Sequence, residues 1–491
     1  MIFNSPTFIF LFLPFVLICT WLAGRRGGNY ILLASSLFFY AWGVDKGGGK
    51  YLVLLLFSIL ANYLAALLIH KYRSSRYSDL FLWLGILINL GLLVYYKYAA
   101  FIIGSLIAPL SPGSFTNPAL QTLILPLGIS FFTFQAIAYL VDVYRDEITP
   151  QRNLPKFALF MSLFPKITAG PIIRYQEVCN DIDHRKFDPE LCLQGFKRFV
   201  IGMGKKVLIA DILAQTANRI FATPIHELNS TVAWLGLVCY TLQIYFDFAG
   251  YTDMAIGLGR IFGFKIQENF NYPYIAKSLT EFWRRWHISL STWFRDYLFI
   301  PLSYILTTEH IRKKIVQGEY KTNYRVLFSI MVVFTLCGLW HGAGWNFVIW
   351  GMLHGTVLCL ENLRLTKIMK KWWPPLQHCY LMFIVMMAWV FFRMPAFSDA
   401  VGFLKALYGF SSSSGFQVTL PMYMNSALSL ALVAGIVLSM PTGKVITDFF
   451  ARHECNRLRI LCESAGIICI VILSFASMAG STFNPFLYQK F

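Results

Sequence analysis

Charged residues are scarce in this sequence. Asp, Glu, Lys and Arg make up 13% of its 491 residues, whereas 57% are hydrophobic. Soluble domains carry about 25% charged residues, so the composition excludes an ordinary soluble enzyme. Apolar runs recur from end to end, and no polar block between them is long enough to fold alone. We predict an all-α polytopic membrane protein in which residues 1–491 form a single membrane-embedded domain.

The signatures of common enzyme classes are missing as well. The chain has no GxSxG, HExxH, Walker A or Rossmann glycine motif. Its 10 cysteines are scattered and form no pair with metal-ligand spacing, so we expect no metal site. No internal repeat is found, which argues against the inverted-repeat transporters.

Basic residues outnumber acidic ones, with 42 Lys and Arg against 24 Asp and Glu. They lie in short loops between apolar runs, which is typical of cytoplasmic loops that face anionic lipid. The excess charge therefore indicates a lipid bilayer as partner and not a nucleic acid. The loops that begin at Arg25, Lys71 and Arg145 alternate with less basic ones. This pattern places these three loops in the cytoplasm and the N-terminus outside.

The apolar runs vary in length. A membrane span needs about 20 apolar residues, and several runs are shorter. We expect about eleven to thirteen crossings, together with re-entrant and in-plane helices. The run 155–170 lies between the basic loop that begins at Arg145 and the basic segment 171–206, both assigned to the cytoplasm, so it enters and returns. Its Pro165 and Gly170 suit a broken backbone that is sheltered by protein.

One histidine, His341, lies in the sequence GLWHGAG between the apolar runs 326–339 and 343–360. Basic loops flank both runs, so the chain crosses upward and returns with Trp340 and His341 near the turn. The first run covers roughly 21 Å at about 1.5 Å per residue, which is less than the roughly 30 Å of the hydrocarbon core. An ionisable group at that depth is a functional candidate. The alternative is a buried histidine that is hydrogen-bonded to a neighbouring helix.

A second histidine, His287, lies in the sequence FWRRWHISLSTWF. Thr280 is a plausible N-cap, with Glu281 in the first turn of a helix. Helical spacing then puts four side chains on one face: Trp283, His287, Leu290 and Phe294. The alternative is an interfacial amphipathic helix, which explains the Trp and Arg residues but not a histidine on the aromatic face.

Two carboxylates, Asp247 and Asp253, lie in the apolar, Gly-rich segment 243–259. An unpaired charge there is costly, so we expect Lys or Arg partners from neighbouring helices. Structural pairing and a proton relay both remain open. Other residues near the motifs are candidates for a substrate or donor pathway: Trp283, Arg284, Arg285, Trp286, Trp340, Asp247 and Asn271.

The chemistry that fits these residues is general-base catalysis. A neutral imidazole near pH 7 can take the proton of a hydroxyl that attacks a thioester or similar acyl donor. A dry cavity would protect that donor from hydrolysis. Neither His287 nor His341 is followed at the fifth position by Asp, because Thr292 and Asn346 stand there. The soluble His-Asp acyltransferase arrangement is therefore missing.

Taken together, these segments resemble the membrane-bound O-acyltransferase family, and specifically its alginate O-acetylase-like bacterial branch. The resemblance covers most of the chain and is tightest over 240–352. It rests on FFTFQ at 131–135, FPKITAGPIIRY at 164–175, QIYFDFAGYTDMAIGLG at 243–259, NFNYPY at 269–274, FWRRWHISLSTWFRDYLFIPL at 282–302 and GLWHGAGWNFVIWG at 338–351.

The resemblance implies a curved ring of membrane helices, with an outer funnel and a cytoplasmic tunnel that meet at His341. His287 matches the second polar position of this branch. The resemblance also implies a bacterial inner-membrane enzyme that takes an acetyl group from acetyl-CoA or another acyl thioester. A periplasmic, hydrolase-like acetyltransferase partner then delivers the group to a polysaccharide hydroxyl, as in alginate biosynthesis, or to peptidoglycan.

The segment 303–325 departs from the IPLGGNR pattern of the branch, which leaves the donor and the polymer open. Two alternatives remain. One is transfer of D-alanine from a carrier protein to teichoic acid, and the other is a non-catalytic transporter or flippase.

The predicted orientation can be tested by cysteine labelling. Single cysteines placed within 1–5 and within 73–78, in a variant without native cysteines, should react differently with a membrane-impermeant thiol reagent. We expect labelling of the first site and protection of the second in intact cells, because basic loops stay in the cytoplasm. Labelling of the second site from outside would overturn the topology.

Overall fold

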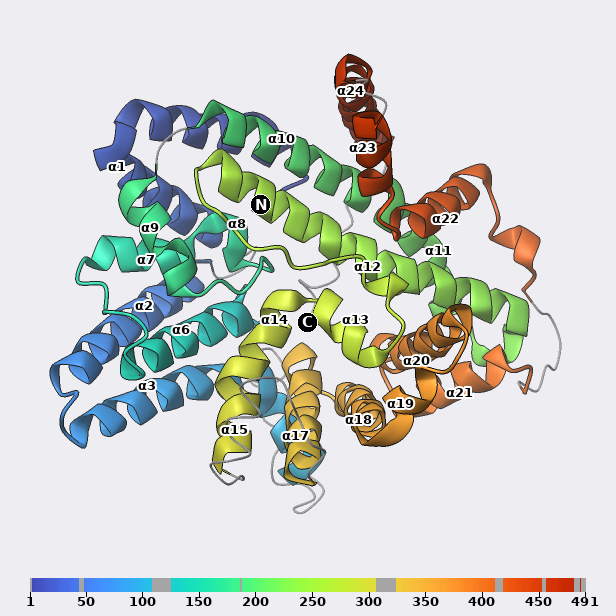
Figure 1. The fold of residues 1–491 in the computed structure, drawn as a ribbon, viewed down its shortest axis with the longest axis horizontal. Coiled ribbons are helices and arrows are strands. Elements are labelled where there is room, and N and C mark those ends of the chain that lie inside the picture. Colours follow the sequence, from blue (N-terminus) through green and yellow to red (C-terminus); the bar gives the residue numbers. More distant parts are fainter. Residues whose placement is uncertain are drawn as a thin grey trace. The chain divides into compact units, whose positions relative to one another are not determined.

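The computed structural model describes residues 2–43, 48–107, 125–185, 188–305, 324–410, 418–452, 456–480 and 486. Every regular element in these ranges is a helix, which confirms the all-α class (Figure 1). The chain divides into two compact units. The first is Met1–Phe199 with Thr252–Glu268, and the second is Val200–Tyr251 with Asn269–Phe491.

Seven helices in the described ranges are long and apolar enough to cross a membrane. The count rises to eight if Ser426–Leu438 and Thr442–Phe450, which are bent by 68°, form one broken span. The polytopic architecture is thus confirmed, but the long spans are fewer than the eleven to thirteen crossings expected. The reason is that several apolar runs form short helices, such as Ile129–Tyr144 and Trp345–Leu360 with 16 residues each.

The first unit is a helical assembly in which α2 packs on α3, and α6 packs on both (Figure 1). Asn62 of α2 and Asn89 of α3 are both buried and hydrogen-bonded to each other, which satisfies two polar side chains between apolar helices. The helices are α1 (Leu13–Trp42), α2 (Gly48–Lys71), α3 (Tyr77–Leu93), α4 (Ala99–Ile102), α6 (Ile129–Tyr144), α7 (Leu154–Ser162), α8 (Phe164–Ile167) and α9 (Tyr175–His184); α10 (Pro189–Gly204) ends in the second unit.

The expected broken backbone of 155–170 is present. Helix α7 ends at Ser162, Leu163 is non-helical, and α8 covers only four residues. All residues from 157 to 170 are buried. A Cβ on Gly170 would lie 2.5 Å from Cα of Lys166, so only glycine allows the chain to fold back so closely there.

The second unit holds most of the tightly matched motifs. Its longest helix, α12 (Ser230–Ile261), begins in this unit and ends in the first. The others are α11 (Asp211–Ala222), α13 (Leu279–Arg285), α14 (Ile288–Phe294), α15 (Ile300–Ile305), α17 (Tyr324–His341), α18 (Trp345–Leu360), α19 (Thr366–Met369), α20 (Pro374–Arg393), α21 (Phe397–Leu407), α22 (Ser426–Leu438), α23 (Thr442–Arg452) and α24 (Asn456–Gly480).

Helices α17 and α18 form a close hairpin (Figure 1). Glycines allow the approach, because a Cβ on Gly338 would clash with the carbonyl oxygen of Phe347, and one on Gly351 with that of Phe334. The hairpin puts His341, the last residue of α17, at its turn, as the sequence predicts.

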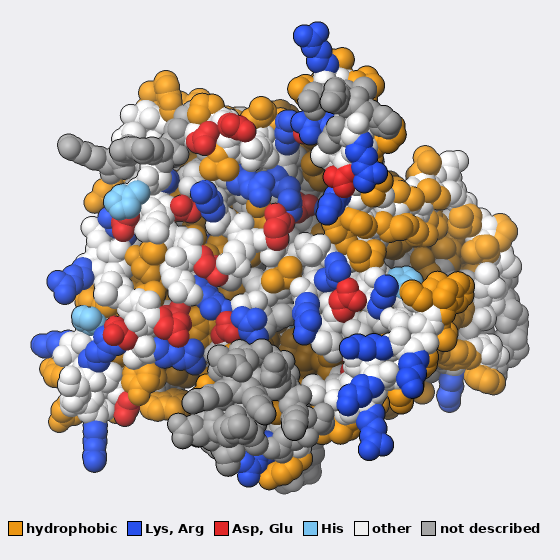
Figure 2. Space-filling model, viewed as in Figure 1, with side chains coloured by type: hydrophobic (Ala, Val, Ile, Leu, Met, Phe, Trp, Pro, Cys, Tyr) orange, Lys and Arg blue, Asp and Glu red, His pale blue; other side chains and the backbone are white. Residues whose placement is uncertain are grey.

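Many large hydrophobic side chains lie on the surface of the molecule. Trp21, Leu461 and Ile472 of the candidate spans are 63%, 66% and 62% exposed. Figure 2 shows hydrophobic side chains of this kind on one face, with Lys and Arg side chains among them. Exposed apolar side chains on long helices are typical of surfaces that face lipid.

Candidate functional site

The segment that carries His287 is not one continuous helix, so the predicted shared face with Trp283, Leu290 and Phe294 is wrong. Helix α13 ends at Arg285, Trp286 is extended, and α14 starts after His287. His287 itself has φ 44° and ψ 55°, in the left-handed region. The predicted N-cap is also wrong, because Ser278 caps α13 by accepting a hydrogen bond from the backbone of Glu281.

Thr280 has a different role, in contact with the buried carboxylate of Glu361. Glu361 accepts hydrogen bonds from the backbone nitrogens of Leu279 (2.7 Å) and Thr280 (2.9 Å) and from the Thr280 hydroxyl (2.6 Å). An acidic group at a helix N-terminus satisfies free N–H groups and is favoured by the helix dipole. Glu361 therefore fastens the start of α13 to the end of α18.

The other end of this segment is held by Asn269. Its Oδ1 accepts hydrogen bonds from the backbone nitrogen of Ser289 (3.1 Å) and from the Ser289 hydroxyl (2.9 Å), and lies 3.2 Å from Nδ1 of His287. Its carbonyl oxygen accepts from the backbone of Ile288 (2.9 Å). All these groups bind one asparagine that lies 18 positions before His287. This distant anchor explains why the chain leaves the helix at Trp286.

The same bonds assign the tautomer of His287. The backbone N–H of Ser289 can only donate, so the asparagine atom that it meets must be the oxygen. Nδ1 of His287 then carries the proton toward Asn269, and Nε2 keeps its lone pair. The side chain is fully buried, and burial lowers the pKa of His287 to about 3, so the ring is neutral at physiological pH.

The two predicted histidines contact the same tryptophan. The ring of Trp340 lies 5.0 Å from that of His341 and 6.0 Å from that of His287. His341 is 2% exposed and also packs against Trp350 at 5.1 Å and Phe392 at 5.3 Å. The structure therefore brings both histidines into one aromatic cluster of the second unit.

More aromatic rings surround this cluster. Trp286 is buried and packs on Phe282 at 5.5 Å and Trp389 at 5.3 Å. Trp389 in turn stacks on Trp350 at 6.0 Å. Large rings of this kind fill space without offering charge, so they exclude water from the histidines.

A third histidine, His354, was not singled out from the sequence. It lies on α18, is fully buried, and accepts a hydrogen bond at Nδ1 from Nε1 of Trp283 at 3.3 Å. Its ring also lies 4.7 Å from that of Trp350. One feature of the sequence could have identified it. His354 follows Trp350 by four residues on an apolar helix, so the two side chains lie on the same helix face.

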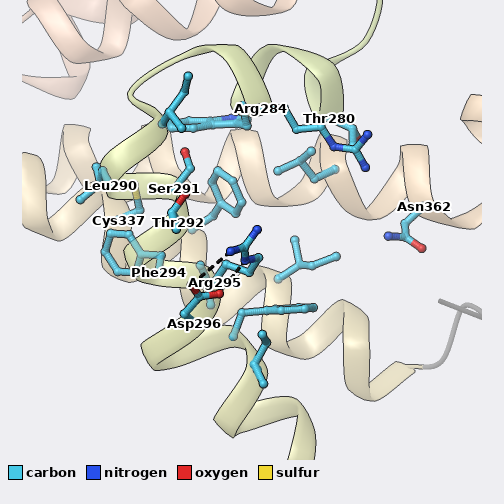
Figure 3. A pocket seen from close by; sticks show the side chains of 18 residues that line it. Thr280, Arg284, Leu290, Ser291, Thr292, Phe294, Arg295, Asp296, Cys337 and Asn362 are labelled. Carbon is cyan, nitrogen blue, oxygen red and sulfur yellow. Dashed lines mark hydrogen bonds and ion pairs between the residues drawn. The ribbon is translucent and has the colours of Figure 1, made fainter. Parts of the chain in front are cut away.

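A cavity of about 830 Å³ opens beside α13 and α14 (Figure 3). The candidates Trp283 and Arg284 line it, and Arg284 is exposed. Arg295 also lines it and is paired with Asp296 at 2.6 Å, as the dashed lines in Figure 3 mark. The remaining lining residues are Thr280, Ile288, Leu290, Ser291, Thr292, Phe294, Phe299, Ile300, Ile330, Val333, Phe334, Cys337, Leu358 and Asn362.

The cavity combines a polar side with an apolar wall, and it reaches the helix that carries His341. Cys337 lies one helical turn before His341 on α17. The cavity can therefore hold an elongated molecule with a charged end and an uncharged arm.

Two other candidates for the donor pathway, Arg285 and Asn271, make contacts with nearby residues of their own segment. Arg285 forms an ion pair with Glu281 at 2.9 Å, and its carbonyl oxygen accepts from the backbone of Asn271 at 2.9 Å. Asn271 is exposed, so the asparagine that meets His287 is the neighbouring Asn269.

The expected basic partner of Asp247 is Lys206, at 2.6 Å. Lys206 also lies 2.8 Å from Asp211, so two carboxyl groups share the buried Lys206. In the first unit Asp253 accepts from Arg198 at 2.6 Å. Both carboxylates of α12 are thus paired with a basic side chain, and this pairing offsets the desolvation of their buried charge.

The strained backbone at His287 yields a stability prediction. His287→Asn should keep most of the thermal stability in detergent, because asparagine tolerates left-handed backbone and its amide can donate to Asn269. His287→Ala should lose about 1–3 kcal/mol of folding free energy, because it removes that bond and leaves buried polar groups without it. Equal melting temperatures for the two variants would contradict this account of the turn.

Comparison with known proteins identifies the family of this chain. The family model of the membrane-bound O-acyltransferase family (MBOAT) matches residues 146–398. The chain is 34% identical over 519 residues to the "Probable alginate O-acetylase AlgI" of Azotobacter vinelandii, covering 100% of both chains. It is 40% identical to that of Pseudomonas aeruginosa, covering 84% of this chain and 76% of the relative. It is 36% identical to the "Peptidoglycan O-acetyltransferase" of Helicobacter pylori, covering 100% and 98%. This chain belongs to the membrane-bound O-acyltransferase family.

Proposed function

We propose that this membrane-bound O-acyltransferase carries an acetyl group from a cytoplasmic thioester across the inner membrane, for O-acetylation of a cell-surface polymer. The observation that carries the proposal is the placement of His341, buried among aromatic rings at the turn of the α17–α18 hairpin. The similarity to alginate and peptidoglycan O-acetylating proteins supports acetyl as the group transferred.

His341 acts as the general base in this proposal. It takes the proton of a hydroxyl that the periplasmic partner presents, which is the acceptor of this step, while the hydroxyl oxygen attacks the thioester carbonyl carbon. The carbon–sulfur bond then breaks, and the same imidazolium returns the proton to the leaving thiolate. The reaction yields an ester and a thiol with no net change in protons, so a buried and uncharged site can run it without an exchange with water.

His287, whose ring lies 6.0 Å from that of Trp340, assists in this proposal. Its Nε2 keeps a lone pair, because Asn269 fixes the proton on Nδ1. This nitrogen can accept a hydrogen bond from the hydroxyl or from a water in the pathway. The fixed ring orientation means that the acceptor position is already set before a substrate arrives.

The donor enters through the cavity beside α13 and α14. An acyl thioester of coenzyme A or of a carrier protein has a phosphate-bearing end and an uncharged arm, which matches the polar and apolar sides of the cavity. Arg284 is exposed at this cavity, and no ion pair to it is found within the described residues. A guanidinium in that state can bind a phosphate oxygen.

The periplasmic side of the reaction needs a partner. The basic loops favour a cytoplasmic donor side. In this proposal a hydrolase-like acetyltransferase of the periplasm then passes the group to the polymer hydroxyl. The polymer is an alginate-like polysaccharide or peptidoglycan, as in the relatives. The departing segment 303–325 bears on donor choice, and its residues 306–323 lie outside the described residues. No described contact favours D-alanyl transfer to teichoic acid or transport without catalysis.

Replacing Arg284 should weaken donor binding. Arg284→Gln should raise KM for acetyl-CoA about tenfold with little change in kcat, because a hydrogen bond to a charged group is worth about 1.5 kcal/mol. Lys277→Gln is the matched control, since Lys277 is exposed and does not line the cavity. Steady-state kinetics in lipid nanodiscs would measure both. An equal KM in both variants would remove Arg284 from donor binding.

The function itself can be tested by deletion and complementation. Loss of the gene should remove O-acetyl esters from the polysaccharide or from muropeptides, as measured by NMR and mass spectrometry. Wild type should restore them, and His341→Ala, present in the membrane at equal amount, should not. His226→Ala is the control, because His226 is 61% exposed. Unchanged ester content in both polymers after deletion would end the proposal.

A further inference from the structure

Among the residues that the structure describes, His354 is the buried histidine that the proposed reaction does not use. It is fully buried on α18, and its ring lies between two tryptophans, 5.4 Å from Trp283 and 4.7 Å from Trp350. A histidine in such a place needs an explanation, because a buried polar ring costs free energy unless its nitrogens are satisfied.

The bond from Trp283 assigns the tautomer of His354. An indole nitrogen can only donate, so Nδ1 of His354 must accept and the proton lies on Nε2. This is the opposite tautomer to that of His287, in which Nδ1 carries the proton. His287 and His354 are thus held in different tautomers by different neighbours, and of these two only His287 leaves Nε2 as a base.

The contacts of His354 connect the cavity to the catalytic histidine. Trp283 lines the donor cavity. Trp350 lies 5.9 Å from Trp283 and 5.1 Å from His341, ring to ring. His354 therefore touches both the cavity wall and the ring on which His341 packs.

We propose that His354 is a positioning residue that fixes Trp283 by accepting its N–H and supports Trp350, on which His341 packs. The cavity wall and the base then keep one geometry, so that a bound thioester meets His341 at reacting distance. This role rests on the proposed function. A displacement of about 1 Å at such a site can cost 10²-fold in rate, so a single hydrogen bond to a wall residue can matter.

Two substitutions of His354 distinguish the role of its Nδ1 from the role of its Nε2. The side-chain oxygen of asparagine can occupy the Nδ1 position, and the amide of glutamine reaches the Nε2 position. His354→Asn should therefore keep the acceptor for Trp283 and retain activity. His354→Gln and His354→Leu should lower kcat about tenfold or more and raise the donor KM. Trp283→Phe, which keeps a ring but loses the N–H, should match them.

A double variant tests whether the two residues act as one unit. Trp283→Phe with His354→Leu should be no worse than either single change, because both remove the same bond. His378→Gln is the control, since the His378 ring nitrogen lies 3.4 Å from the carbonyl oxygen of Ala276, outside the cavity and the aromatic cluster. It should keep wild-type kinetics.

A spectroscopic measurement keeps this proposal separate from the proposed function. The hydrogen-bond-sensitive Raman band of the Trp283 indole, obtained as the difference between wild type and Trp283→Phe, should shift in His354→Leu and His354→Gln but not in His354→Asn. This readout needs no turnover. If the band shifts as expected but wild type transfers no acyl group, the function fails and the contact stands. An active His354→Gln beside an inactive His354→Asn, or an unshifted band in His354→Leu, would overturn the positioning role.

Discussion

The position of His287 depends on one side chain, Asn269. A polar group that is buried away from water must find its partner inside the protein, and Asn269 supplies that partner for the turn between α13 and α14. Glu361 does the same at the start of α13. With both ends fastened, the short helix cannot slide, and the cavity wall formed by Trp283 and Arg284 keeps its place.

The side chains that surround His341 are aromatic and carry no charge. Trp340, Trp350 and Phe392 enclose His341. The buried carboxylate of Asp247 on α12 is paired with Lys206. An aromatic environment of this kind excludes water from the imidazole that acts as the general base in the proposed reaction. It also suits a reaction in which the proton moves from one bound group to another, since no net charge has to be stabilised.

Much of this arrangement could be predicted from the sequence, and the limits have physical causes. The depth of His341 follows from the length of the run before it and from the glycines that allow the hairpin. The break at Trp286 could not be predicted, because local spacing there favours a helix and the opposing bonds come from Asn269. The anchor of α13 at Glu361 lies 81 residues beyond Thr280 in the chain, where no local pattern indicates it. His354 was missed because a histidine on an apolar helix is usually a satisfied core residue.

In the proposed reaction His341 takes the proton of the acceptor hydroxyl. The most direct measurement is single-turnover acyl transfer by His341→Gln protein in lipid nanodiscs, with labelled thioester donor and the acceptor partner supplied. Glutamine keeps hydrogen bonding and similar size but cannot take up the proton. If His341 is the general base, the transfer rate falls by about 10²–10⁴-fold while donor affinity is unchanged. Transfer at the wild-type rate would contradict this role and leave His341 a structural residue.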